Sequence, residues 1–154
     1  MHKHELIDRL ITLARLDLDA SRLYGQAVRN IGEPEVRRTL EGFLADHDDH
    51  VAALSGMLEQ MGQLAPVSLP ESRDFFTAGI QPLTETESPG KTLEDLLLDE
   101  RAVLTIYRQQ MSPALPGEES RLIDGNIADE ERHVRYLEQA VREMSVTAGK
   151  GRRR

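Results

Sequence analysis

Apolar residues recur at three- and four-residue steps along four segments of the chain. In the first segment, residues 5–31, they are Leu6, Leu10, Leu13, Leu16, Ala20, Leu23, Ala27 and Ile31. This spacing places the apolar side chains on one face of a helix, and no proline interrupts the segment. The same periodicity covers residues 34–61, 92–111 and 118–145. The pattern therefore predicts an all-α fold with four long helices.

Glycine and proline mark the expected ends of these helices. Gly32 follows the first helix, where a glycine in the left-handed conformation often ends a helix, and Pro34 suits the first turn of the second. Gly62 is the expected stop of the second helix, and Pro113 and Pro116 separate the third helix from the fourth. Because the link between the first two helices is short, they must be antiparallel neighbours.

The segment between the second and third helices, residues 63–91, differs in composition from the rest. Its prolines stand among Ser, Thr and Glu residues, so it is expected to be a connection with one short turn at residues 74–78. A connection of about 28 residues can span a helix of about 40 Å, which allows the second and third helices to be parallel. We therefore predict an antiparallel four-helix bundle with one long crossover. The alternative is a flexible linker between two separate helical hairpins.

Length, charge and cysteine content narrow the class of protein. The chain of 154 residues fits one domain, expected at residues 1–148, followed by a basic, disordered tail at residues 149–154. The absence of cysteine excludes disulfides, thiolate zinc sites and iron–sulfur clusters, and it fits a cytoplasmic protein. The net charge of −8 argues against nucleic-acid binding, and the lack of a long apolar run argues against a membrane span.

Polar residues repeat between the two halves of the chain at one constant offset, since His133 lies 83 residues after His50. The pairs at this offset are Asp17 and Glu100, Tyr24 and Tyr107, His47 and Glu130, and His50 and His133. Packing residues such as Leu54 and Leu137 follow the same register. A helix pair used twice explains this pattern, and the matched polar residues are of the types that bind metals.

Asp17 and Glu100 each lie in the apolar stripe of a helix. A carboxylate in such a position must be paired, protonated or bound to a metal, because an isolated buried charge is too costly. Tyr24 and Tyr107 follow these carboxylates by seven residues, about two helical turns, and share their faces. We expect the two tyrosines to donate hydrogen bonds to ligand carboxylates, with simple core packing as the alternative.

Two further pairs stand three residues apart and so point to one side of their helices. They are His47 with His50, and Glu130 with His133. A single Glu-x-x-His pair is also typical of a solvated helix face, but here four helices supply matched candidates. Imidazole together with carboxylate suits iron, manganese or zinc better than magnesium or calcium. Asp46, one turn before His50, is a weaker additional candidate ligand.

These residues resemble the ferritin-like superfamily, most closely its rubrerythrin and bacterioferritin branch of carboxylate-bridged di-iron proteins. The resemblance covers residues 5–145, and its strongest stretch, Ile-Ala-Asp-Glu-Glu-Arg-His at residues 127–133, is similar to the Glu-x-x-His motif of that family's last helix. It implies that Glu130 and His133 form this motif, and that His50 is the histidine of the second helix.

The resemblance also implies that Asp17 and Glu100 are the single carboxylates of the first and third helices. The chain departs from the family pattern in two places. Asp17 is shorter than the glutamate expected there, and His47 stands where the second helix should carry a glutamate. A dinuclear site would lose one bridging carboxylate as a result, unless Asp46 or solvent replaces it. A mononuclear site or a metal other than iron are the alternatives.

The resemblance implies a di-iron centre, with manganese or zinc as alternatives, that acts in Fe(II) oxidation, iron handling or defence against peroxide. Its partners would be metal ions and O2 or peroxide, and a reductive cycle would need an electron-donor protein because the chain has no cysteine-bound electron carrier. A homodimer is the default assembly. Two other hypotheses stay open: a site that stores metal without turnover, and a metal-free structural or stress-related bundle that acts through protein contacts.

Overall fold

The computed structural model describes residues 2–66, 82–83, 88–110 and 117–152. These residues form four helices, α1 (Lys3–Asn30), α2 (Pro34–Gln60), α3 (Pro89–Gln110) and α4 (Gly117–Arg152), and include no strand. The predicted all-α class and the four predicted helices are confirmed. The turn expected at residues 74–78 and most of the predicted crossover lie outside the described residues.

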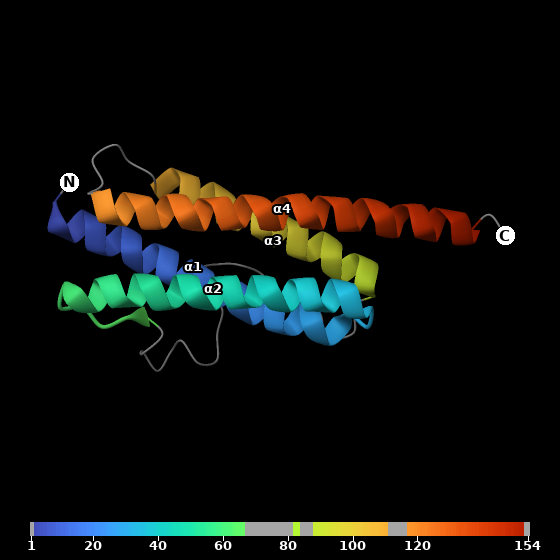
Figure 1. Ribbon diagram of the computed structural model, residues 1–154, viewed down its shortest axis with the longest axis horizontal. Coiled ribbons are helices and arrows are strands. Elements are labelled where there is room, and N and C mark those ends of the chain that lie inside the picture. Colours follow the sequence, from blue (N-terminus) through green and yellow to red (C-terminus); the bar gives the residue numbers. More distant parts are fainter. Residues whose placement is uncertain (1, 67–81, 84–87, 111–116, 153–154) are drawn as a thin grey trace.

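The four helices form one bundle, in which α1 and α4 run in one direction and α2 and α3 in the other (Figure 1). Helix α1 packs against α2 and α3, and α4 packs against α3 and α2, so each neighbouring pair is antiparallel. The end of α2 and the start of α3 lie at opposite ends of the bundle (Figure 1). This arrangement confirms the antiparallel bundle with one long crossover, and the packing of α1 on α3 contradicts two separate hairpins.

Helix α1 ends in a different way from the prediction for Gly32. Gly62, at φ 78°, is the only glycine with a positive φ among the described residues, so Gly32 does not adopt the left-handed conformation. Instead, the Arg37 Nε of α2 donates hydrogen bonds to the carbonyls of Val28 and Ile31, at 3.1 and 2.9 Å. A side chain from the next helix satisfies the last carbonyls of α1, and no special glycine conformation is needed.

Both ends of α2 follow the prediction. Pro34 occupies the first turn, and the Glu33 carboxylate accepts hydrogen bonds from the backbone N–H groups of Glu35 and Val36. At the other end, Gly62 donates to the carbonyl of Glu59, and the next residue donates to Leu58, each at 3.0 Å. This pair of hydrogen bonds around a left-handed glycine is a Schellman motif, which stops the helix.

Two helix boundaries differ from the predicted ones. Helix α3 begins at Pro89 instead of residue 92, because the Ser88 hydroxyl accepts a hydrogen bond from the N–H of Lys91 and proline suits the first turn. Helix α4 continues past residue 145 to Arg152, through residues 149–152 that were predicted to be a disordered tail. No proline follows Pro116, so nothing of that kind interrupts the helix.

All four helices contribute fully buried leucines to the core, for example Leu13, Leu54, Leu96 and Leu137. Carboxylates and histidines are buried in the same interior, which is costly unless they are paired or bind a metal. No helix in the described part of the chain carries an apolar stretch long enough to cross a membrane.

Candidate metal centre

The six strongest predicted ligands come together inside the bundle. They are Asp17 from α1, His47 and His50 from α2, Glu100 from α3, and Glu130 and His133 from α4. None of them is more than 3% exposed. They form two overlapping groups of four residues, which share two members. In each group one nitrogen or oxygen atom per residue lies within 4.8 Å of the others. The sequence offset therefore identified residues that meet in space.

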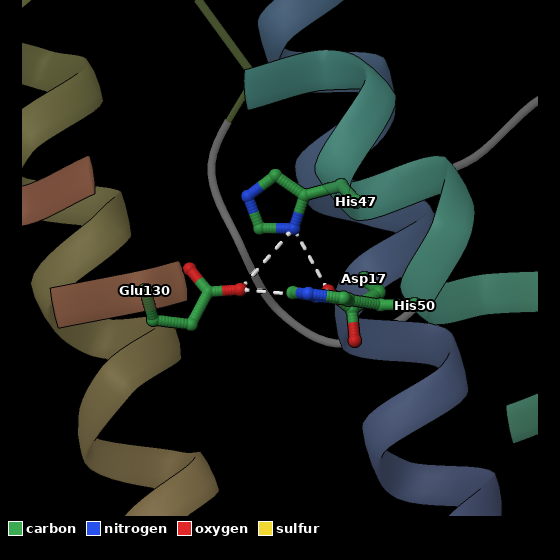
Figure 2. Close-up of side chains that lie close together, drawn as sticks. All are labelled: Asp17, His47, His50 and Glu130. Atoms are coloured by element: carbon green, nitrogen blue, oxygen red, sulfur yellow. Dashed lines mark hydrogen bonds and ion pairs between the residues drawn. The ribbon is translucent and has the colours of Figure 1, made fainter. Parts of the chain in front are cut away.

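The first group consists of Asp17, His47, His50 and Glu130 (Figure 2). Oδ1 of Asp17 lies 2.8 Å from Nδ1 of His47 and 2.9 Å from Nδ1 of His50. Oε1 of Glu130 faces the same two nitrogens, at 3.4 and 3.5 Å. Two nitrogens and two oxygens thus converge on one point between α1, α2 and α4.

The second group consists of His47, Glu100, Glu130 and His133. Oε1 of Glu100 lies 2.6 Å from Nδ1 of His133 and 3.1 Å from Nε2 of His47. Oε2 of Glu130 lies 3.5 Å from Nδ1 of His133. His47 and Glu130 belong to both groups, so the two sets of donors share one imidazole and one carboxylate.

The donor set fits transition-metal ions. Both carboxylate oxygens of Glu130 and Oε2 of Glu100 are buried and accept no hydrogen bond from the described residues. Buried carboxylate oxygens usually accept hydrogen bonds, because leaving them unsatisfied costs free energy. Two nitrogen and two oxygen donors in each group suit zinc, iron, manganese or copper, and a bound ion would satisfy these oxygens.

Burial and neighbouring charges shift the pKa of the central groups. Burial raises the pKa of Glu130, and although His47 opposes this shift, the nearby Glu100 adds to it, so the pKa reaches about 7. Burial alone would lower the pKa of His50, but contacts with Asp17 and Glu130 raise it to about 10. His133 responds in the same way to Glu100 and Glu130, with a pKa of about 9. Without metal, the centre therefore holds protons on its histidines at neutral pH, and metal binding must displace them.

The outer nitrogens of two histidines contact carboxylates near the surface. Nε2 of His133 lies 2.8 Å from Oδ2 of Asp46, and Nε2 of His50 lies 2.8 Å from Oδ2 of Asp129. Arg132 donates a hydrogen bond to each of these carboxylates, at 2.8 and 3.1 Å. The structure thus places Asp46 outside both groups of four, where it orients His133 with Nδ1 toward the centre.

Asp129 is a residue that the sequence analysis missed. Because 129 − 46 = 83, it matches Asp46 at the same offset as the other pairs, and this signal was available in the sequence. The two aspartates act across the bundle: Asp46 of α2 contacts a histidine of α4, and Asp129 of α4 contacts a histidine of α2. The duplication therefore includes the residues that orient the ligands.

The two tyrosines differ in their contacts. The Tyr107 hydroxyl donates a hydrogen bond to Oδ2 of Asp17 and accepts one from the Asn126 amide at 3.1 Å, as expected for a residue that orients a ligand. The Tyr24 hydroxyl has no hydrogen-bond partner among the described residues, although its ring lies beside His47, with 5.2 Å between centroids. Only Tyr107 makes the predicted hydrogen bond to a ligand carboxylate.

Comparisons with known proteins identify the fold. Neither the family models nor the sequences of curated proteins match this chain. Among solved structures, it is similar to Dps from Thermosynechococcus elongatus, with a TM-score of 0.74 and 13% identity over 90% of this chain and 92% of that one. It is also similar to a hypothetical protein from Pyrococcus furiosus, with a TM-score of 0.68 and 15% identity over 88% of each chain. At these identities the likeness concerns the fold, and the chain has the ferritin-like four-helix fold.

Proposed function

We propose that this protein binds two transition-metal ions, iron in the first place, inside the bundle and uses them to oxidise Fe(II) or to reduce peroxide. The observation that carries this proposal is the position of Glu130. Its two oxygens face different groups of donors and accept no hydrogen bond in the described structure. A buried carboxylate in this position is explained by two cations, one on each oxygen.

The residues have distinct roles in this proposal. Asp17 and His50 would hold one ion, Glu100 and His133 the other, and Glu130 both. When bound, iron would supply one-electron redox chemistry for the two-electron reduction of O2 or of peroxide. Tyr107 fixes the orientation of Asp17 through its hydrogen bond.

The outer carboxylates complete this assignment. Asp46 and Asp129 keep the Nδ1 atoms of their histidines turned toward the centre. Their side chains are 26% and 37% exposed, so they are also the part of the network that solvent reaches. A negative charge at this position attracts cations and favours metal entry over anion entry.

Metal titration tests the proposal. The purified chain, stripped with a chelator, is titrated anaerobically with Fe(II), and bound iron is counted before O2 or H2O2 is added and absorbance is followed. We expect two ions per chain and rapid oxidation. Glu130→Gln should lose at least one ion and the rapid phase, whereas Glu118→Gln, an exposed change on the same helix, should behave as the wild type. Binding of fewer than two ions by the wild type would refute the proposal.

A metal-free structural bundle is the second candidate, and one observation favours it. Each of the three central histidines already contacts a carboxylate through each ring nitrogen, so carboxylates compensate the histidine charges without a metal. For such a protein, iron, manganese and zinc should leave the melting temperature unchanged. A third outcome, two tightly held ions that do not react with O2 or peroxide, would identify metal storage.

A further inference from the structure

Among the buried polar pairs matched at the 83-residue offset, His47 and Glu130 are the pair in which an imidazole in one half corresponds to a carboxylate in the other. They are also the two residues that both groups of donors share. Each offers two donor atoms that point to different groups. Nδ1 of His47 lies 2.8 Å from Asp17 of the first group, and Nε2 lies 3.1 Å from Glu100 of the second.

We propose that His47 bridges the two metal ions through both ring nitrogens, as an imidazolate, while Glu130 bridges them on the other side through its carboxylate. This inference rests on the proposed function, in which two ions bind. The first ion would have Asp17, His50, Nδ1 of His47 and Oε1 of Glu130 as ligands. The second would have Glu100, His133, Nε2 of His47 and Oε2 of Glu130.

The spacing of the donors fits this assignment. Within the two groups, the distances between histidine nitrogens and carboxylate oxygens range from 2.6 to 3.5 Å. A tetrahedral ion with bonds of about 2.0–2.1 Å needs donors about 3.3 Å apart. Each group therefore offers two nitrogens and two oxygens close enough together to hold one ion.

The bridge requires the imidazolate form of His47. A neutral imidazole carries a proton on one ring nitrogen, so it can bind a metal only through the other nitrogen. Two divalent ions next to the ring favour loss of this last N–H proton to solvent, because bound cations are the largest charges in such a site.

The bridge has a structural consequence. In typical two-metal sites the ions lie about 3.5–4 Å apart. Ions on opposite sides of an imidazole ring, with bonds of about 2.0–2.1 Å, must lie about 6 Å apart. With His47 in place of the expected glutamate, the two ions would still be bridged. The distance between them would, however, be longer. Zinc and copper bind imidazole and accept tetrahedral or related geometries. They therefore become candidate ions for this site alongside iron.

Two measurements test the bridge. Crystals loaded with Zn(II) give the separation of the ions from anomalous scattering at the zinc edge. Chains loaded with Cu(II) give the magnetic coupling, because two bridged Cu(II) ions lose most of their paramagnetic resonance intensity on cooling. We expect a separation near 6 Å and strong loss of the signal in the wild type. His47→Gln, which has one donor oxygen, leaves only the Glu130 carboxylate between the ions, so it should change both their separation and their coupling.

Two further variants sharpen the test. His50→Gln removes a ligand from one ion only. It should therefore lower the affinity for that ion several-fold and leave the magnetic coupling intact in the fully loaded chain. His47→Glu should shorten the separation to about 3.5–4 Å. If the wild-type ions lie that close, or if His47→Gln leaves both the separation and the coupling unchanged, the bridge is refuted while the metal centre stands. If the wild type fails to bind two ions, both the bridge and the proposed function fall.

Discussion

Removal of the charge on Glu130 should stabilise the metal-free protein. This side chain is fully buried and accepts no hydrogen bond from the described residues, so its ionised form is unfavourable in the folded state. Burial raises its pKa from the ordinary 4.5 to about 7. At about 1.36 kcal/mol per pH unit, the folded protein loses about 3 kcal/mol as the pH rises through this interval. Glu130→Gln keeps the shape and removes the ionisation.

The sign follows from linkage. Because the folded-state pKa lies above the unfolded one, the folded protein holds the proton more tightly, and stability falls between pH 4.5 and 7. Glu130→Gln does not undergo this loss. Its advantage over the wild type should therefore be small at pH 5 and reach up to about 3 kcal/mol at pH 8. For a chain of this size, that equals a rise in melting temperature of about 6–12 °C.

Urea and thermal unfolding in the presence of a chelator measure this effect, with wild type and variant compared at pH 5 and pH 8. Glu118→Gln, at an exposed position of α4, serves as the control and should change stability by less than about 0.5 kcal/mol at either pH. If metal-free Glu130→Gln is less stable than the wild type at pH 8, the central ion pairs outweigh desolvation, and the reasoning is refuted.

Three further predictions concern the surrounding network. Asp46→Asn and Asp129→Asn should each lower metal affinity about 10–100-fold, measured by competition with a chelator, because they loosen the orientation of a histidine; unchanged affinity would remove that role. Tyr107→Phe should cost about 1–3 kcal/mol in urea unfolding, whereas Tyr24→Phe, which breaks no described hydrogen bond, should cost less; equal losses would contradict this. Metal affinity should rise from pH 7 to 10, because the pKa of His50, about 10, lies above its ordinary value of 6.5, and the proton competes with the ion. Over that range the metal-free protein should lose stability, as circular dichroism melts would show.

The helices and the central residues could be predicted because both follow from local periodicity and from one repeat. Helix spacing determines which side chains share a face, and the 83-residue offset pairs equivalent positions of the two halves. The end of α1 could not be predicted in this way, because the Arg37 side chain that completes it belongs to the next helix. Asp129 directly precedes Glu130 and points to another side of α4, so its contact with His50 depends on how α2 and α4 face each other.

The unequal tyrosines show why a repeat does not guarantee equal contacts. Asn126, which donates to the Tyr107 hydroxyl, matches Phe43 at the offset, since 126 − 43 = 83. A phenyl ring cannot hydrogen-bond to Tyr24, and instead it packs edge-on against that ring with centroids 6.0 Å apart. Phe43 also stacks on His133, with centroids 4.1 Å apart. One half of the site therefore holds its tyrosine by a hydrogen bond and the other by ring packing.

The same comparison between halves bears on whether the centre is a functional site or a remnant. A bundle that no longer needs metal would be free to fill its core with apolar residues, which avoid the cost of buried charge. At the centre, however, Asp17 matches Glu100 and His47 matches Glu130, so each position keeps a side chain with metal-binding atoms. The replacement at His47 even keeps two donor atoms directed at two groups of ligands. A match in which one residue lacks metal-binding atoms, such as Phe43 with Asn126, occurs outside the two groups of donors, among residues that contact the ligands or Tyr107. This distribution favours a centre that still binds metal, and it makes His47 the residue whose substitution is most informative.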